Sequence, residues 1–324
     1  MRYVDVFNGD ADGICALLQL QLSSPRDSEL VTGVKRDIDL LRQVRAGAGD
    51  RVTVLDVAME KNRADLDRLL AAGASVFYVD HHIPGEIPEH AGLQAIINTA
   101  PEVCTSLLVN GHLKGAHARW AVVGAFGDNL GESARRLAAQ IGLDGEALAA
   151  AENLGNYINY NGYGPSIEDL HFAPADLFRR LRPYADPLAF IAGDRETFGR
   201  LEEGFHGDMG MAAALKPMHE SASAAVFLLP DEPWARRVSG VYSNDLVNLH
   251  PARAHAVLTE IGGGDLLVSV RAPLANRTGA DEVCRQFPTG GGRKAAAGIN
   301  RLAREDLARF IDVFCSFYAA HAGS

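Results

Sequence analysis

The chain has 324 residues, of which 47% are hydrophobic and 22% are charged. This length exceeds the ~250–300 residues at which a single core usually stops growing, so we expect two globular domains and exclude a disordered or fibrous chain. The formal net charge of −10 argues against a basic surface that follows long nucleic acid, but it allows a small phosphorylated substrate held by a few local groups.

Short apolar segments alternate with longer amphipathic ones up to about residue 130. This alternation is typical of a parallel sheet covered by helices. The predicted strands are residues 3–7, 52–57, 74–79 and 120–126. The predicted helices between them are residues 13–22 and 62–72, and the stretch from 130 to 200 is expected to be mostly helical.

A boundary is predicted within residues 204–217, where Gly, His, Met and Pro interrupt the periodicity. We therefore expect one domain at residues 1–210 and a smaller one at residues 211–324. The second domain should be a mixed α+β domain. Its predicted elements are β segments at 224–229, 254–261 and 266–270, a glycine cluster at 290–292 and a helix at 304–320.

The four cysteines are widely spaced, and Asp5 interrupts the first apolar run. The cysteine spacing fits neither a disulfide framework nor a zinc knuckle. No stretch of eighteen consecutive apolar residues occurs in the sequence. We therefore expect a cytoplasmic protein that is neither secreted nor inserted into a membrane.

Acidic and histidine side chains follow the predicted strands of the first domain. They are Asp10, Asp12, Asp56, Asp80, His81, His82 and Asp128. Ligands of open parallel sheets bind at the carboxyl ends of the strands, so these side chains should converge there. Carboxylates that lie so close repel one another unless cations neutralise them, and oxygen ligands with an imidazole suit two Mn²⁺-like ions. Each residue alone is better explained as a helix cap or turn residue, but the joint occurrence favours a metal site.

Four segments resemble the motifs of the DHH phosphoesterases: NGDADG at 8–13, VLD at 54–56, VDHH at 79–82 and GAFGD at 124–128. LVSVR at 267–271 and GGGRKAAAG at 290–298 resemble the associated DHHA1 domain. This superfamily includes RecJ exonucleases, nanoRNase/pAp phosphatases, cyclic-dinucleotide phosphodiesterases and family II pyrophosphatases. The resemblance implies an α/β fold: a parallel-sheet DHH domain with helices on both faces, followed by a smaller mixed α+β DHHA1 domain.

The resemblance also implies a cofactor of two Mn²⁺ ions, for which Co²⁺ or Mg²⁺ could substitute. One ion would be bound by Asp10 and Asp56, with Asn8 as a weak ligand where many members carry His or Asp. The other would be bound by Asp12, Asp56, His81 and Asp128. Asp80 and His82 would be the catalytic residues: Asp80 would orient His81, and His82 would meet a phosphoryl oxygen of the substrate.

Five residues of the second domain are candidate substrate-binding residues: Arg271, Gly290, Gly291, Gly292 and Arg293. Glycines let backbone N–H groups approach an anion closely. Arg293 follows the three glycines at the position where the DHHA1 domain usually has His. A guanidinium can bind a phosphate through two hydrogen bonds. The alternatives are that Arg293 is an exposed charge and that Arg271 forms a surface ion pair with Asp265 or Asp281.

Two other features have simpler explanations. Tyr157, Tyr160 and Tyr163 could stack on a base, but their spacing favours packing into a core. The basic pair Lys35 and Arg36 is expected to be solvated.

We therefore expect a Mn²⁺-dependent, oligoribonuclease-like phosphoesterase that uses two-metal activation of water. Its substrates would be phosphodiester or phosphomonoester bonds of small nucleotides or short oligonucleotides. The alternatives are an inorganic polyphosphate or pyrophosphate hydrolase, and a catalytically silent nucleotide-binding regulatory module. Neither long nucleic acid nor a membrane is an expected partner, and a homodimer is left open.

Overall fold

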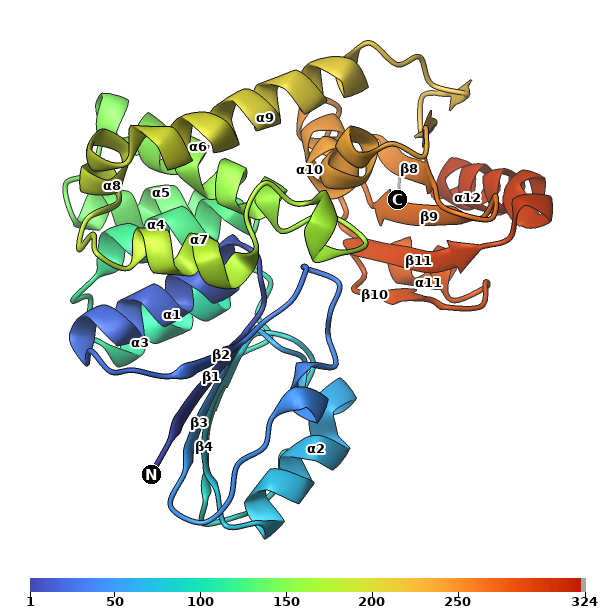
Figure 1. Ribbon diagram of the computed structural model, residues 1–324. Coiled ribbons are helices and arrows are strands. Elements are labelled where there is room, and N and C mark those ends of the chain that lie inside the picture. Colours follow the sequence, from blue (N-terminus) through green and yellow to red (C-terminus); the bar gives the residue numbers. More distant parts are fainter. Residues whose placement is uncertain (322–324) are drawn as a thin grey trace. The chain divides into compact units, whose positions relative to one another are not determined.

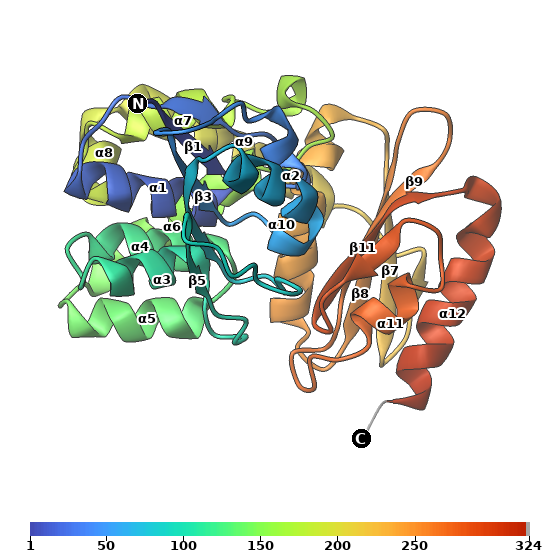
Figure 2. The same cartoon turned by 90° about the horizontal axis from the view of Figure 1, so that it is seen from below.

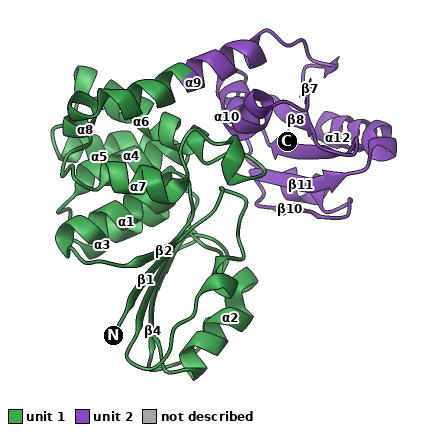
Figure 3. Cartoon of the chain, in the orientation of Figure 1, with its two compact units in different colours: residues 1–203 green, residues 204–324 purple. Residues whose placement is uncertain are grey.

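The computed structural model describes residues 1–321, which divide into two compact units, residues 1–203 and the described residues from 204 onward (Figure 3). Helix α9 (Arg195–Ala213) contains both the observed division and the predicted one at residue 210. Most of residues 204–217, where the sequence predicts an interruption of regular structure, therefore belong to this helix. Glycine weakens a helix by only ~1 kcal/mol per residue, so the glycines in this stretch do not end it. None of the described helices is long and apolar enough to cross a membrane.

The first unit contains a five-stranded sheet in which every neighbouring pair is parallel (Figure 1). In spatial order the strands are β2 (Glu29–Val31), β1 (Tyr3–Phe7), β3 (Arg51–Leu55), β4 (Ser75–Asp80) and β5 (Leu93–Ile97). The inner strands are buried along most of their length, which is typical of strands covered on both faces. Because β1, β3 and β4 run parallel to one another, the residues that follow these strands lie at the same edge of the sheet.

Helices cover both faces of this sheet (Figure 1). Helix α2 (Met59–Ala71) and the short 3₁₀ helix η1 (Leu40–Gln43) share one core cluster with the strands. Helix α1 (Ala11–Ser23) and helix α3 (Thr105–His112) lie on the other face. Helix α1 is buried along most of its length, since further helices pack on its outer side.

The rest of the first unit is helical, as expected. It comprises α4 (Ala118–Gly127), α5 (Gly131–Gln140), α6 (Gly145–Asn161), η2 (Ile167–Asp169), α7 (Pro174–Leu181), α8 (Pro187–Gly193) and the first part of α9. The prediction of a strand at 120–126 is wrong, because these residues lie in α4. Helix α4 packs between α1 and α6, and nine of its ten residues are buried, all but Arg119, so it has no polar face from which a helical period could be read.

The second unit contains a six-stranded mixed sheet. Its spatial order is β10 (Gly290–Gly292), β11 (Ala296–Leu302), β9 (Leu266–Arg271), β8 (Ala254–Glu260), β7 (Ala224–Leu229) and β6 (His219–Glu220). Only β7 and β8 pair in parallel. Helix α10 (Pro233–Leu249) covers one face, while α11 (Ala280–Cys284) and α12 (Leu307–Ala320), which follows the 3₁₀ helix η3 (Arg304–Asp306), cover the other (Figure 2). The expected mixed α+β domain is confirmed.

Candidate metal centre

Three neighbouring strands of the first unit end at the same edge of the sheet. Phe7 pairs with Leu55, and Leu55 pairs with Val79. The ladder continues beyond the strands, because the Asp56 N–H donates to the Val79 carbonyl at 3.1 Å. Asp56 has a φ of 57°, a left-handed conformation that is uncommon for a residue other than glycine. Such strain clusters at functional sites, and here it falls on the first residue after a central strand.

Asp10 and Asp12 are fixed by the ends of two helices. Asp10 is the N-cap of α1, and its Oδ1 accepts from the N–H groups of Asp12 at 3.0 Å and Gly13 at 3.2 Å. The Asp12 carboxylate faces the start of α3, where the N–H groups of Thr105 and Ser106 each donate to it at 2.7 Å. Helix N-termini favour negative charge, so α3 holds Asp12 in one orientation.

Asp128 reaches the site from the carboxyl end of helix α4, not from a strand. Asp128 is the first residue after α4. The approach of α4 to α1 is close, since a Cβ on Gly127 would lie 2.3 Å from the Cβ of Ala11. Glycine at this position therefore allows the packing that brings Asp128 to the site.

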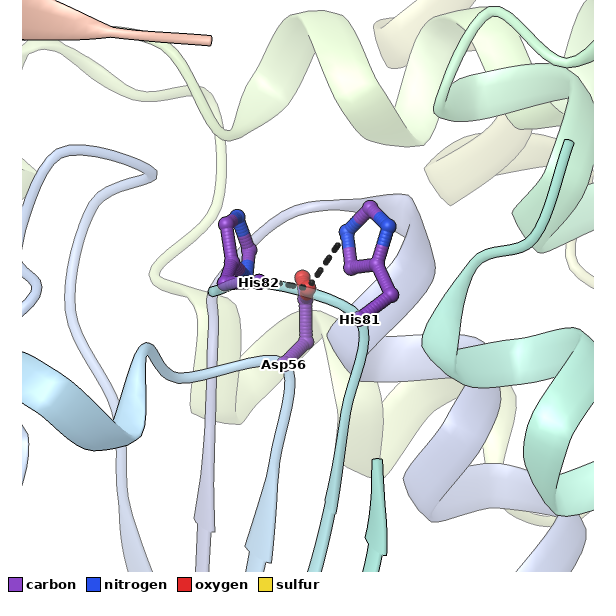
Figure 4. A group of neighbouring side chains, drawn as sticks. All are labelled: Asp56, His81 and His82. Atoms are coloured by element: carbon purple, nitrogen blue, oxygen red, sulfur yellow. Dashed lines mark ion pairs between the residues drawn. The ribbon is translucent and has the colours of Figure 1, made fainter. Parts of the chain in front are cut away.

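His81 lies at the centre of these carboxylates. Its Nε2 is 3.4 Å from Asp56 Oδ1, 3.8 Å from Asp128 Oδ2 and 3.9 Å from Asp12 Oδ2. Figure 4 shows the Asp56 carboxylate lying between the rings of His81 and His82. Among the described residues, two sets of three have ligand atoms within 4.8 Å of one another: Asp12 with His81 and Asp128, and Asp56 with His81 and His82.

The hydrogen bond on the far side of His81 fixes its tautomer. His81 Nδ1 lies 2.9 Å from the Val103 carbonyl oxygen, which can only accept, so Nδ1 carries the proton. His81 Nε2, on the other side of the ring, faces the three carboxylate oxygens. Carboxylates that converge in this way need a cation, and one imidazole with several carboxylates is a donor set for a borderline-hard divalent ion. These residues therefore fit the metal that the resemblance implies.

Asp80 does not have the partner that the sequence predicts. The Asp80 carboxylate contacts His82, with Oδ1 2.8 Å from His82 Nδ1, whereas His81 is oriented by the Val103 carbonyl. Asp80 is completely buried, but the side chain of His82 is 32% exposed. Burial would lower the pKa of His82, but the hydrogen bond to Asp80 and the charges of Asp80 and Asp56 outweigh it, so the pKa is raised.

The carboxylates repel one another. Burial, together with the charges of Asp10 and Asp12, holds the pKa of Asp56 well above its usual range. Burial and the charges of Asp128 and Asp10 also raise the pKa of Asp12, against the opposing effect of His81. Asp10 differs from both: burial would raise its pKa, but the charge and hydrogen bond of Lys35 lower it.

The prediction that Lys35 is solvated is wrong. Its Nζ lies 2.5 Å from Asp10 Oδ2 and 2.9 Å from Asn159 Oδ1, and it lies over the ring of Tyr163 at 5.3 Å from the centroid. Burial would lower the pKa of Lys35, but the charge of Asp10 raises it. No local signal could identify this residue, because Lys35 and Asp10 are 25 positions apart in sequence. The tyrosine prediction is confirmed: Tyr157, Tyr160 and Tyr163 are buried.

The candidate substrate-binding residues of the second unit lie close together. Arg271 ends β9 opposite Ala296, and Arg293 lies in the turn between β10 and β11. The Arg271 guanidinium donates to Asn244 Oδ1 at 2.6 Å. The two carboxylates considered as alternative partners of Arg271 pair with other arginines, Asp265 with Arg301 and Asp281 with Arg285.

The structure explains why glycine is needed at two of the three positions of the glycine cluster. A Cβ on Gly290 would lie 1.8 Å from the Cys284 carbonyl oxygen, and Gly292 has a φ of 140°. A Cβ on Gly291 would meet nothing within 4 Å. The three residues form β10, an edge strand paired with β11. Their use by a phosphate therefore stays a prediction.

Comparison with solved structures supports the same fold. The structure is similar to the exonuclease RecJ bound to manganese, with 20% identity, a TM-score of 0.64, and 98% of this chain and 90% of that chain covered. It is also similar to the DHH domain of a protein described as a member of a family of ribosomal proteins (13% identity, TM-score 0.65, 98% and 86% covered). A third similar structure is the pGpG-specific phosphodiesterase PggH from Vibrio cholerae (16% identity, TM-score 0.56, 99% of both chains covered). No protein-family model and no curated protein matches the sequence.

These likenesses confirm the expected fold, a parallel-sheet domain followed by a mixed-sheet domain, which this chain shares with the RecJ structure and with the DHH-domain structure. At these levels of identity they concern the fold alone. The chemistry of this chain has to be argued from its own residues.

Proposed function

We propose that this chain is a divalent-metal-dependent phosphoesterase of the DHH type. Its substrates would be phosphodiester or phosphomonoester bonds in small nucleotides or short oligonucleotides. The observation that carries the proposal is the convergence of Asp12, Asp56 and Asp128 on Nε2 of His81, at 3.4–3.9 Å. A bound divalent ion would polarise a phosphoryl oxygen and make water nucleophilic at neutral pH.

The protein's own residues would bind the ion, orient the catalytic histidine and donate a proton. Asp12, Asp56, His81 and Asp128 would hold the ion, and the helix α3 N–H groups keep Asp12 in place. Asp80 fixes the His82 ring through Nδ1, which leaves Nε2 for the substrate. Because the pKa of His82 is raised, His82 would be protonated over a wider pH range and could donate to a phosphoryl or leaving-group oxygen.

Mn²⁺ is the ion that we propose, with Mg²⁺ or Co²⁺ as substitutes, because oxygen ligands and one imidazole suit an ion of that hardness. One similar structure is a manganese-bound exonuclease, and another is a phosphodiesterase specific for pGpG. The net charge of −10 favours short substrates over long strands. A cytoplasmic location, expected from the cysteine spacing, belongs to the same proposal.

The test is a substrate panel: pAp, linear di- to pentanucleotides including pGpG, cyclic dinucleotides, pyrophosphate and polyphosphate. The chelator-treated protein is assayed for release of phosphate or mononucleotide after addition of Mn²⁺, Mg²⁺ or Co²⁺. We expect Mn²⁺-dependent turnover of at least one small nucleotide, and its loss in Asp12→Asn. Asp67→Asn, a substitution on the exposed side of α2, is the matched control and should leave turnover unchanged.

The same panel separates the alternatives. Turnover of pyrophosphate or polyphosphate alone would replace the nucleotide proposal with an inorganic hydrolase. One observation favours the alternative of a catalytically silent nucleotide-binding module. The Lys35 ammonium is bonded to Asp10, a residue that the resemblance assigns to a metal. Nucleotide binding without turnover under every metal condition would establish that alternative.

A further inference from the structure

One half of the expected two-metal site already contains a positive charge. The resemblance assigns one ion to Asp10, Asp56 and Asn8, but Lys35 Nζ lies 2.5 Å from Asp10 Oδ2. The Lys35 side chain is only 23% exposed. It is held in place by Asn159 Oδ1 at 2.9 Å and by the ring of Tyr163. The Lys35 backbone N–H also donates to the Gly162 carbonyl at 2.8 Å. Lys35 is therefore held at its backbone and at its ammonium group.

Both oxygens of Asp10 are engaged. Oδ1 accepts from the N–H groups of Asp12 and Gly13 as the helix cap, and Oδ2 accepts from Lys35. Asp12 also accepts two backbone N–H groups, but neutral donors can share a carboxylate with a metal ion. An ammonium at 2.5 Å cannot do so as easily, since it repels a divalent ion at the same oxygen.

Asn8, which the resemblance also assigns to that ion, is a weak ligand. Asn8 is an uncharged amide, and its Nδ2 donates to the Lys35 carbonyl at 3.2 Å. Its Oδ1 is buried and has no hydrogen-bond partner within residues 1–321, so it is one neutral donor atom. Among the described residues, neither set of three close metal-ligand groups contains Asp10. Apart from Asp56, which the other ion shares, the ligands of this ion are thus one neutral oxygen and a carboxylate already paired with an ammonium.

We propose that this chain binds a single divalent ion, at Asp12, Asp56, His81 and Asp128, and that the Lys35 ammonium takes the place of the second ion. Lys35 neutralises Asp10, so three carboxylates and one neutral imidazole remain for the single ion. The Lys35 charge would also attract a substrate phosphate, and this last part rests on the proposed function. The ion count does not, because it is measured without substrate.

The first test counts ions on the full chain without substrate. Chelator-treated protein is titrated with Mn²⁺ in a calorimeter, and bound manganese is then measured by elemental analysis and electron paramagnetic resonance. We expect one Mn²⁺ per chain with the spectrum of an isolated ion. Two Mn²⁺ per chain with a spin-coupled spectrum would overturn the proposal, whatever the activity of the protein.

The second test restores the missing ligand and removes the built-in charge. We expect the double variant Asn8→Asp/Lys35→Met to bind two Mn²⁺ per chain and to give a spin-coupled spectrum. Lys61→Met on the exposed side of α2 is the matched control and should still bind one. A folded double variant that binds a single ion would contradict the assignment of Lys35. If the double variant does not fold, the count on the natural chain still decides the proposal.

The two proposals fail in different ways. A chain that binds one Mn²⁺ but hydrolyses no member of the panel would refute the proposed function and leave the ion count intact. A chain that hydrolyses a nucleotide with two coupled Mn²⁺ would do the reverse.

Discussion

The buried pair of Asp80 and His82 makes a measurable prediction. Asp80→Asn keeps the shape of the side chain and removes its charge. In the natural chain Asp80 Oδ1 lies 2.8 Å from His82 Nδ1, and the carboxylate is fully buried. The substitution therefore replaces a charge-assisted hydrogen bond with a neutral one and removes the main support for protonated His82.

The expected magnitude follows from that exchange. A hydrogen bond to a charged group contributes ~1.5–3 kcal/mol and a neutral one ~0.5–1.5 kcal/mol. The difference of ~1–1.5 kcal/mol corresponds to about tenfold in rate, and misorientation of the ring extends the range to ~10–100-fold. Mn²⁺ affinity should change little, because Asp80 belongs to neither set of close metal-ligand groups among the described residues.

The assay is kcat/KM for a linear dinucleotide as a function of pH at saturating Mn²⁺. Asp80 raises the pKa of His82, so the protonated form is lost only at higher pH. In Asp80→Asn the decline of activity with rising pH should therefore begin at lower pH than in the natural chain or in the control Asp67→Asn. An unchanged pH profile with full activity would refute the acid role of His82. Loss of Mn²⁺ binding would instead make Asp80 part of the metal site.

Three further predictions concern stability and substrate binding. Metal-free Asp56→Asn should be more stable than the natural chain at pH 7 by ~1–3 kcal/mol, because the raised pKa of Asp56 means that its ionisation above the ordinary value of 3.8 destabilises the folded state. In urea unfolding this advantage should shrink as the pH falls toward 4, and an advantage that is constant with pH would contradict the reasoning. Gly290→Ala should lower the melting temperature sharply, since the new Cβ would lie 1.8 Å from the Cys284 carbonyl oxygen, whereas Gly291→Ala should leave it unchanged; equal melting temperatures would exclude this explanation. Arg293→Gln should raise KM for the best substrate ~10-fold at unchanged Mn²⁺ affinity, and an unaltered KM would identify Arg293 as an exposed surface charge.

The sequence predicted the fold well where local pattern and burial agree. The strands of both sheets have apolar runs bounded by polar or glycine residues, and β7 was predicted at residues 224–229, where it occurs. Helix α4 was mistaken for a strand because it is apolar on every side. Asp128 follows residue 127 whether the segment is a strand or a helix, and in the structure it lies beside His81.

Which residues of the site contact one another was harder to predict than which residues belong to the site. The sequence puts Asp80 next to both histidines and does not distinguish between them, whereas in the structure the Asp80 carboxylate contacts His82. Val103 could not be found at all, since its backbone carbonyl, not its side chain, orients His81. Lys35 was missed for a related reason: the path of the chain after β2 brings it to Asp10.

The central claim is that metal-dependent phosphoester hydrolysis takes place around His81. The most direct measurement is the initial rate of mononucleotide release from a linear dinucleotide as Mn²⁺ is added back to chelator-treated protein, for the natural chain and for His81→Gln. We predict that the natural chain has no activity in chelator and gains activity in step with bound Mn²⁺, while His81→Gln stays inactive and binds the ion much more weakly. Hydrolysis that persists in chelator, or that His81→Gln retains in full, would contradict the account.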